Sequence, residues 1–161
     1  MLPDAQARDQ QVSSSSGFSL TELMASVSIV GILSSIALPN YIQQLNRAKQ
    51  SDVVNLIAQI QNTIQAYREE FLSQPSGWDD LALITAVPTA AGAASGGAFS
   101  AITSPGGQYQ LAISANGDVI TLSATPISID QRWQVLACLN TENGYSAISR
   151  DPGSSPNCSG S

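Results

Sequence analysis

The stretch GFSLTELMASVSIVGILSSIALPNY, residues 17–41, is almost wholly apolar, yet it carries Glu22 near its beginning and Pro39 near its end. Residues 18–38 form a run of about 21 residues, which is enough for a helix to cross a hydrocarbon core of about 30 Å. Its serines are expected to bond back to helix carbonyls and so to tolerate lipid. The stretch therefore predicts a helix able to span a membrane, with one carboxylate that a membrane penalises.

The helical pattern changes character after Pro39. Apolar side chains then recur at steps of four and three residues, which places them in one stripe on a helix: Val53, Ile57, Ile60, Ile64, Tyr67 and Phe71. The next strong breaker is SQPSGW at 73–78. Because proline kinks a helix without necessarily ending it, we predict one helix of about 50 residues, apolar all round in its first half and amphipathic in its second. The alternative is a membrane helix and a separate soluble helix, broken at Pro39.

The second half of the chain predicts a small antiparallel sheet. Its four alternating segments are 108–114, 119–125, 132–139 and 145–149. The first two flank Asn-Gly-Asp and the last two flank NTENG, and both connections are hairpin signals. A four-stranded meander has one apolar face, which the helix stripe can cover, so the fold class is α+β. The Ala- and Gly-rich segment 88–107 predicts a surface loop with little regular structure.

The only two cysteines are Cys138 and Cys158. In a chain outside the cytosol such a pair is expected to form a disulfide. Closing a loop of about 20 residues would stabilise the fold by about 3 kcal/mol in the chain-entropy model. Two free thiols remain the alternative if the domain stays in the cytosol.

The composition disfavours enzymes and nucleic-acid binders. The 161 residues suit one domain, only 11% are charged, and the net charge is −6, so bulk attraction to nucleic acid or to an anionic membrane is not expected. There is no histidine, which removes the Ser-His-Asp and Cys-His catalytic sets. The acid pairs at 69–70 and 79–80 are interpreted as solvated faces. We predict neither an enzyme nor a DNA-binding subunit.

No cofactor or metal is expected from the sequence. Oxygen donors stand on predicted turns without the spacing of a calcium loop: Asp118, Asp130, Asp151 and Asn157. One weak calcium site among them stays open. Trp78 and Trp133 are interpreted as packing residues rather than as base-stacking ones.

From Gly17 to about Lys49 the sequence resembles the class III signal and N-terminal helix of type IV pilins and pseudopilins. The shared features are a glycine, then Phe18, a glutamate four residues on, an apolar helix, and a proline followed by asparagine and tyrosine. The remainder is similar in layout only: helix, loop, antiparallel sheet and a cysteine-closed C-terminal loop. That layout resembles pilins more than the major pseudopilin, which usually lacks such a loop.

The resemblance implies roles for individual residues. A prepilin peptidase would cut between Gly17 and Phe18, and Phe18 would become an N-methylated N-terminus. Glu22 would pair with the N-terminal ammonium of a neighbouring subunit and set the axial register, because breaking a buried ion pair costs about 3–5 kcal/mol. The alternative is a carboxylate that reaches the membrane interface near the helix start. Gly31 and Pro39 would bracket a weak stretch of helix that melts locally during assembly.

The resemblance also implies an organisation of the whole chain. A cleaved leader would occupy 1–17, a transmembrane and filament-core segment 18–39, and a globular head 40–161. The head would contain an αβ-loop at 74–107, a sheet at 108–150 and a C-terminal loop at 138–158. The leader departs from the family, because four serines stand where Lys or Arg usually precedes the glycine. The positive-inside rule therefore gives no support for a cytoplasmic leader.

The implied function is that of a structural subunit of a type IV pilus. Its partners would be copies of itself, other pilins, a prepilin peptidase and methyltransferase, and an inner-membrane assembly platform. The chain would span the inner membrane of a bacterium before assembly and would then lie in an extracellular pilus, whose role in adhesion or twitching motility the sequence does not specify. The alternatives are a minor pilin or pseudopilin of a secretion or competence filament, and a membrane-anchored adhesin that never polymerises.

Overall fold

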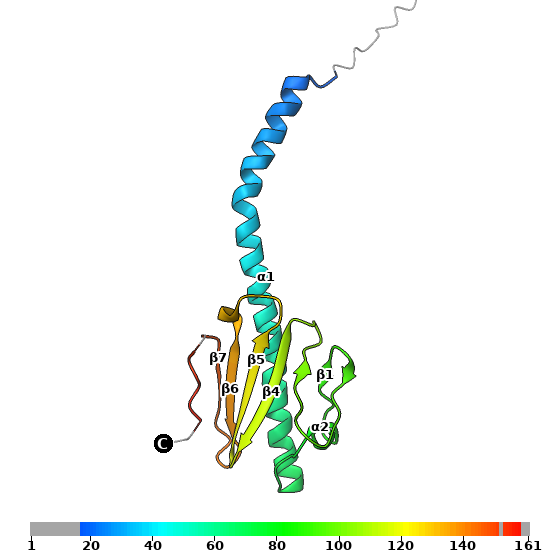
Figure 1. Ribbon diagram of the computed structural model, residues 1–161, viewed down its shortest axis with the longest axis vertical. Coiled ribbons are helices and arrows are strands. Elements are labelled where there is room, and N and C mark those ends of the chain that lie inside the picture. The colour runs from blue at the N-terminus through cyan, green and yellow to red at the C-terminus, as the bar shows by residue number, and fades with distance from the viewer. Residues whose placement is uncertain (1–16, 152, 159–161) are drawn as a thin grey trace, which may run out of the picture. The chain divides into compact units, whose positions relative to one another are not determined.

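The computed structural model describes residues 17–151 and 153–158, and the chain divides into two compact units between Asn40 and Tyr41. In chain order the elements are α1 (Leu20–Phe71), α2 (Trp78–Ala82), β1 (Pro88–Thr89), β2 (Gly92–Ala93), β3 (Ile102–Thr103), β4 (Tyr109–Asn116), β5 (Val119–Pro126), the 3-10 helix η1 (Gln131–Trp133), β6 (Val135–Asn140) and β7 (Ser146–Ser149) (Figure 1). The fold is α+β, as the sequence predicts.

Helix α1 is a single helix of 52 residues with Pro39 inside it. The prediction of one continuous helix is therefore confirmed. The alternative, two helices broken at Pro39, is wrong. Three of the four serine hydroxyls between residues 26 and 35 bond back to the helix, as predicted. Oγ of Ser26, Ser28 and Ser35 donates to the carbonyls of Glu22, Met24 and Ile32, at 2.8, 2.8 and 2.7 Å.

The main sheet has five antiparallel strands in the order β3-β4-β5-β6-β7, one more than the four that the sequence predicts. The predicted hairpin at Asn116 is present, with Asn116 paired to Val119 and Gly117 at a φ of 60°. A positive φ suits glycine, and it lets the chain reverse within two residues. The second hairpin pairs Leu139 with Ser146, and the four predicted strands correspond to β4 to β7.

The segment predicted as an irregular loop contains three short strands, so that expectation is corrected. β1 pairs with β2 in a separate two-stranded ladder, and β3 adds to the edge of the main sheet by pairing Ile102 with Leu111. The backbone N–H of Ala90 donates to the carbonyl of Thr103 at 3.1 Å, which occupies part of the outer side of that edge strand. A glycine at the turn, Gly92, adopts a φ of 116°. Strands of only two residues show no alternating pattern in an Ala/Gly-rich sequence.

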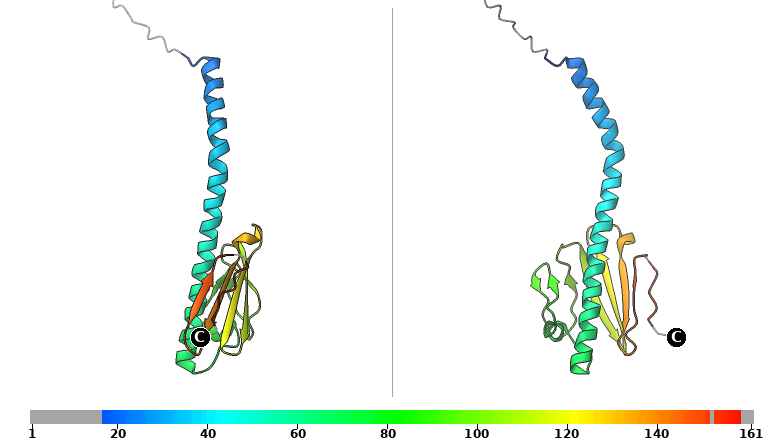
Figure 2. Two further views of the ribbon diagram at one scale, coloured as in Figure 1. Left: turned by 90° about the vertical axis from the view of Figure 1, so that its left-hand side faces the viewer. Right: turned by 180° about the vertical axis from the view of Figure 1, so that it is seen from behind.

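The core lies between the later part of α1 and one face of the sheet (Figure 2). Most of the predicted stripe is buried there: Val53, Ile57, Ile60, Ile64 and Tyr67. The facing core side chains from the sheet include Leu111, Ile120, Leu122, Val135 and Leu139. The last stripe residue, Phe71, is the exception, because it is 45% exposed.

Candidate functional site

The predicted cleavage point lies just outside the helix. Gly17 and Phe18 are exposed, and α1 begins only at Leu20, so the peptide bond between them is not held in helical hydrogen bonds. Residues 1–16 of the predicted leader lie outside the described residues.

Ser19 and Glu22 form a reciprocal cap at the start of α1. The backbone N–H of Ser19 donates to Oε2 of Glu22 at 3.0 Å, and the N–H of Glu22 donates to Oγ of Ser19 at 3.2 Å. This is a capping box, which satisfies two backbone donors that a helix start leaves unpaired. Our reading of the sequence missed it, although the Ser-x-x-Glu spacing is its signal. A carboxylate in the first turn also complements the helix dipole.

The first part of α1 presents apolar side chains on every side. Within the described part of the chain, α1 is the one helix long and apolar enough to cross a membrane. Its large apolar side chains are exposed throughout this part: Leu20, Leu23, Met24, Val27, Ile29, Val30, Ile32, Leu33, Ile36 and Leu38. Apolar surface of this extent is typical of contact with lipid or with other protein chains. The helix therefore fits membrane anchoring, protein contact, or both in turn.

Gly31 and Pro39 lie within this exposed region. A Cβ added at Gly31 would meet no atom within 4 Å, so nothing in the single chain requires glycine there. Near Pro39, Nδ2 of Asn40 donates to the carbonyl of Ile36 at 3.3 Å. The roles assigned to Gly31 and Pro39 stay predictions about assembly.

The C-terminal segment is fixed to the sheet by a disulfide between Cys138 and Cys158, with 5.8 Å between their Cα atoms. Nδ2 of Asn140 adds a hydrogen bond of 3.1 Å to the carbonyl of Cys158. On the helix side, Nε2 of buried Gln61 donates to the carbonyl of Cys138 at 2.9 Å. The disulfide was predicted, whereas the inward position of Gln61 was not, because glutamine in an amphipathic helix usually marks the solvent face.

A polar cluster ties the end of α1 to two turns of the sheet. Nη1 of Arg68 lies 2.8 Å from Oγ1 of Thr141 and 3.6 Å from Oδ1 of Asp118. Nε2 of Gln74 donates to Oγ1 of Thr141 at 2.9 Å. The N–H of Thr141 donates to the carbonyl of Asp118 at 2.8 Å. These contacts hold the β4–β5 turn and the loop after β6 against the helix end.

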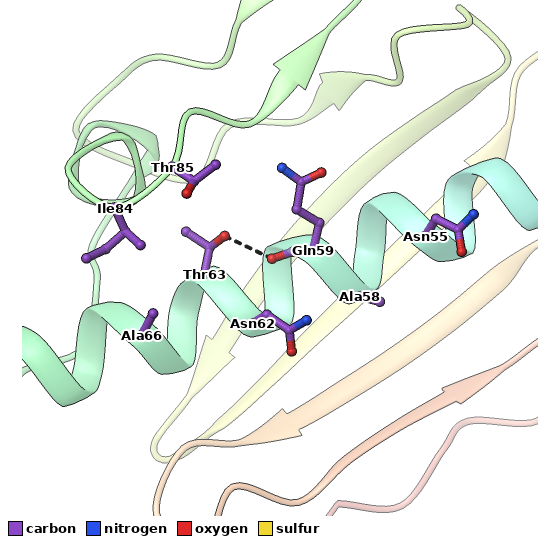
Figure 3. A pocket seen from close by; sticks show the side chains of 8 residues that line it. All are labelled: Asn55, Ala58, Gln59, Asn62, Thr63, Ala66, Ile84 and Thr85. Carbon is purple, nitrogen blue, oxygen red and sulfur yellow. Dashed lines mark hydrogen bonds between the residues drawn. The ribbon is translucent and has the colours of Figure 1, made fainter.

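A hollow of about 510 Å³ lies between α1 and the segment after α2 (Figure 3). Figure 3 shows α1 side chains on one side of it and Ile84 and Thr85 on the other. Its lining is Asn55, Ala58, Gln59, Asn62, Thr63, Ala66, Ile84 and Thr85. None of these side chains can act as a general acid or base, because amides, methyl groups and threonine hydroxyls do not titrate near neutral pH.

The paired acids around α2 have local structural partners. Oδ1 of Asp79 accepts from the N–H of Gly96 at 2.8 Å. Oδ2 of Asp80 accepts from both the hydroxyl and the N–H of Ser76 at 2.7 Å. The Ser76 hydroxyl and then its N–H hold the pKa of Asp80 below its ordinary value, because both bonds favour the charged form. These acids therefore stabilise the loop around α2.

Two of the oxygen donors considered for calcium lie beside arginines. Asp118 precedes β5 and Asp130 follows it, and each lies next to an arginine, Arg68 and Arg132 respectively. Among residues 17–151 and 153–158, no three His, Cys, Asp or Glu side chains come together in a way that could hold a metal ion.

Comparison with known proteins adds to this geometry. Residues 12–38 match the family described as the prokaryotic N-terminal methylation motif. Over 67 residues the chain is 40% identical to the type IV major pilin protein PilA of Myxococcus xanthus (strain DK1622), covering 41% of this chain and 28% of that protein. Over 76 residues it is 33% identical to the type II secretion system core protein G of Aeromonas hydrophila, covering 47% of this chain and 53% of that protein.

The chain thus spans about a quarter and about half of the lengths of these two relatives, and no solved structure matches it significantly. Neither relative is named as an enzyme. The methylation motif and the two relatives, together with the long capped helix and the disulfide-bonded α+β fold, support the placement of the chain in the type IV pilin and pseudopilin superfamily.

Proposed function

We propose that this protein is a structural subunit of a type IV pilus. It assembles into a helical filament through the apolar part of α1, after cleavage between Gly17 and Phe18 and N-methylation of Phe18. The observation that carries the proposal is the exposed apolar surface of α1, in which Glu22 is the only charged side chain between residues 17 and 46. Such a surface is stable in lipid or against identical helices, and not in water.

Glu22 gives the filament its register. The capping box provides the carboxylate with one N–H donor within its own chain, which lowers the cost of holding it at membrane depth. Cleavage leaves a new ammonium at Phe18, and methylation of an amine keeps its charge. In the filament, the N-terminal ammonium of a neighbouring subunit pairs with the Glu22 carboxylate. At any other axial offset between subunits, the carboxylate lacks this partner.

Assembly exchanges lipid contacts for helix contacts. Lipid tails are as apolar as leucine, so the net gain in free energy is smaller than for a transfer from water. This makes extraction and reinsertion by a motor feasible. Local melting between Gly31 and Pro39 would let helices adjust their packing, because glycine lowers helix propensity by about 1 kcal/mol and proline lacks a backbone donor.

The implied path of the chain runs from the inner membrane to the cell surface. Before assembly it spans the membrane once, where a prepilin peptidase and methyltransferase act on it and an assembly platform receives it. Afterwards it lies in an extracellular pilus with copies of itself and other pilins. The methylation motif and the apolar helix support this path.

A second candidate is a pseudopilin of a secretion filament. It is favoured by the similarity to the type II secretion core protein, of which the chain covers 53%. The disulfide that closes the C-terminal loop favours the pilus subunit instead, since the loop layout resembles that of pilins. Both candidates polymerise through the same helix, so they differ in abundance and location rather than in mechanism.

Shearing of surface fibres tests the proposal. We expect this chain to dominate the sheared material and a Glu22→Ala variant to remain in the membrane. A scarce chain in abundant fibres would indicate a minor pilin or pseudopilin. Normal function of Glu22→Ala with no fibres at all would contradict the proposal and indicate an anchored surface protein.

A further inference from the structure

The end of α1 holds a large apolar side chain out into solvent. Leu72 follows the last helical residue, is 88% exposed, and has a φ of 53°, a left-handed conformation that favours glycine. Its N–H donates to the carbonyl of Arg68 at 2.9 Å, so the residue closes the helix in the position that glycine usually takes. Phe71 beside it packs on the ring of Tyr67, with ring centroids 4.5 Å apart. A left-handed conformation at a leucine rather than a glycine motivates a hypothesis of function for this position.

Two carboxylates flank this apolar end. Glu69 and Glu70 are exposed, and neither forms an ion pair within the described residues. Arg68, the nearest cation in sequence, is directed to Asp118 and Thr141 instead. We name residues 69–72 the Leu72 knob: an apolar tip with a negatively charged shoulder.

A groove of about 380 Å³ lies elsewhere on the same unit, between an earlier part of α1 and the loop that joins β3 to β4. Its walls include Lys49, Asp52 and Leu56 from the helix, and Pro88, Pro105 and Gly106 opposite. Lys49 is the only lysine of the chain, is half-buried, and has no ion-pair partner among the described residues. We name this hollow the Lys49 groove: its lining combines apolar side chains with polar ones, and its lysine has no ion-pair partner among the described residues.

The knob and the groove complement each other in chemistry, but they cannot meet within one chain. Lys49 and Phe71 both belong to α1 and are separated by about 33 Å along its axis at 1.5 Å per residue. A knob can therefore reach only the groove of another copy. Because the two surfaces are different patches, the contact is heterologous, and repeating it produces an open chain of subunits rather than a closed dimer.

We propose that the Leu72 knob of one copy docks into the Lys49 groove of the next, with the Leu72 side chain against the apolar walls and Glu69 or Glu70 paired with Lys49. The inference rests on the proposed function, since it names a second contact in the same filament, made between heads rather than between apolar helices. It explains why leucine occupies a position where glycine would be less strained.

Asp52 allows the direction of the charge effect on docking to be tested. It lines the same groove three residues after Lys49, and it repels an incoming carboxylate. Asp52→Asn is therefore expected to strengthen docking, whereas Lys49→Glu weakens it. A groove with a purely structural role would not respond to these two changes in opposite directions.

The first experiment separates docking from folding at Leu72. Leu72→Gly relieves the left-handed strain and removes the knob, so the melting temperature should not fall while fibre yield falls about tenfold, the scale of a residue that carries interface energy. Leu83→Asn is the matched control, because Leu83 is also an exposed leucine (66%) but has an ordinary φ of −66°. Unchanged fibre yield in Leu72→Gly would overturn the proposal.

The second experiment exchanges the charges. Lys49→Glu should lower fibre yield, and adding Glu69→Lys and Glu70→Lys to the same chain should restore it. Arg47→Glu is the matched control, since it makes the same charge change two residues away on α1 and does not line the groove. The specific pairing of Lys49 with Glu69 or Glu70 would be contradicted by two results together: the combined variant does not recover fibre yield, and Arg47→Glu lowers it as much as Lys49→Glu.

The third experiment detects the contact directly. Both native cysteines are in the disulfide, so Leu72→Cys combined with Pro105→Cys introduces the only free thiols within the described residues. Mild oxidation in cells should give a ladder of dimers, trimers and larger species on denaturing gels. Leu83→Cys with Pro105→Cys should give no ladder.

The outcomes separate the two proposals. Fibres from the native chain together with no ladder from the Leu72–Pro105 cysteine pair overturn the docking contact and leave the pilus subunit intact. An absence of fibres from the native chain overturns the pilus subunit. In that case a ladder in membranes still supports the docking contact, and monomers alone overturn it.

Discussion

Ser19 and Glu22 bind each other reciprocally at the start of α1, through hydrogen bonds of 3.0 and 3.2 Å between the backbone N–H of each and the side chain of the other. The single charged side chain of the apolar segment is thus also a helix cap. Within one chain the carboxylate orders the first turn of the helix. In the filament we expect it to bind a neighbouring N-terminus as well, so one residue links helix initiation to subunit register.

Variants at Ser19 and Glu22 separate these two roles. Ser19→Ala removes the hydroxyl cap and should destabilise the first turn by about 1 kcal/mol, but it keeps the charge, so fibres still form. Glu22→Gln can still accept the N–H of Ser19, because glutamine also serves in capping boxes, but it carries no charge, so fibres are lost. The measurement is fibre yield after shearing, relative to chain in the membrane. Loss of fibres in Ser19→Ala, together with a normal fibre yield in Glu22→Gln, would show that assembly depends on the Ser19 cap and not on the charge of Glu22.

Gln61 is expected to stabilise the head from inside. Gln61→Met keeps a similar volume but leaves the buried carbonyl of Cys138 without this donor, which should cost about 1–3 kcal/mol. Gln65→Met is the control, since Gln65 bonds to the carbonyl of Gly144 near solvent at 3.1 Å and should cost less than about 1 kcal/mol. Denaturant unfolding of the detergent-solubilised chain measures both. Equal losses of unfolding free energy in the two variants would show that burial of the Gln61 hydrogen bond adds nothing to the stability of the head.

Tyr109 should make the fold sensitive to alkali. It is buried and donates to the carbonyl of Trp133 at 3.0 Å, and burial raises its pKa above the ordinary 10.0. The unfolded chain therefore releases this proton at lower pH than the folded chain does. The stabilisation that the buried, protonated phenol of Tyr109 contributes is fully present below pH 10.0. It is lost as the pH rises through the pKa of Tyr109 in the folded chain.

Tyr109→Phe tests this linkage. The variant should lose about 1 kcal/mol at neutral pH, because a hydrogen bond is removed, and its stability should fall less steeply than that of the native chain above about pH 10. Tyr145→Phe, at an exposed tyrosine, is the control. Parallel pH profiles for native chain and Tyr109→Phe would show that this phenol does not contribute.

Loss of the disulfide should destabilise the C-terminal segment and the head. The sequence separation of 20 between the cysteines gives about 3 kcal/mol in the chain-entropy model. Cys158→Ala and chemical reduction of the native chain should therefore lower the unfolding midpoint by similar amounts, and reductant should not affect Cys158→Ala further. An unchanged midpoint after complete reduction would show that the hydrogen bond of Asn140 to the carbonyl of Cys158 holds the segment alone.

Strong local periodicity made much of the fold predictable. The four-three spacing from Val53 to Tyr67 indicated the helix and its buried face, and the Asn116-Gly117 turn indicated the first hairpin. Pro39 did not end the helix, because a proline removes one backbone donor and can kink a helix without ending it.

Very short strands, and a side chain with a distant partner, were not predictable in the same way. β3 has only two residues and exists through its pairing with β4, and β1 and β2 exist through each other. The inward position of Gln61 depends on a carbonyl 77 residues away. Phe71 fits the stripe by spacing but lies near the helix end, where the core no longer covers it. At the site, the apolar helix was predicted, whereas the capping box and the Leu72 conformation were not.

Mass spectrometry of the chain recovered from sheared surface fibres tests the central claim most directly. The account predicts a mature chain that begins at Phe18 with a methylated amine and carries the intact Cys138–Cys158 disulfide. A chain that retains the residues before Phe18, recovered only from membranes and absent from every fibre preparation, would contradict it.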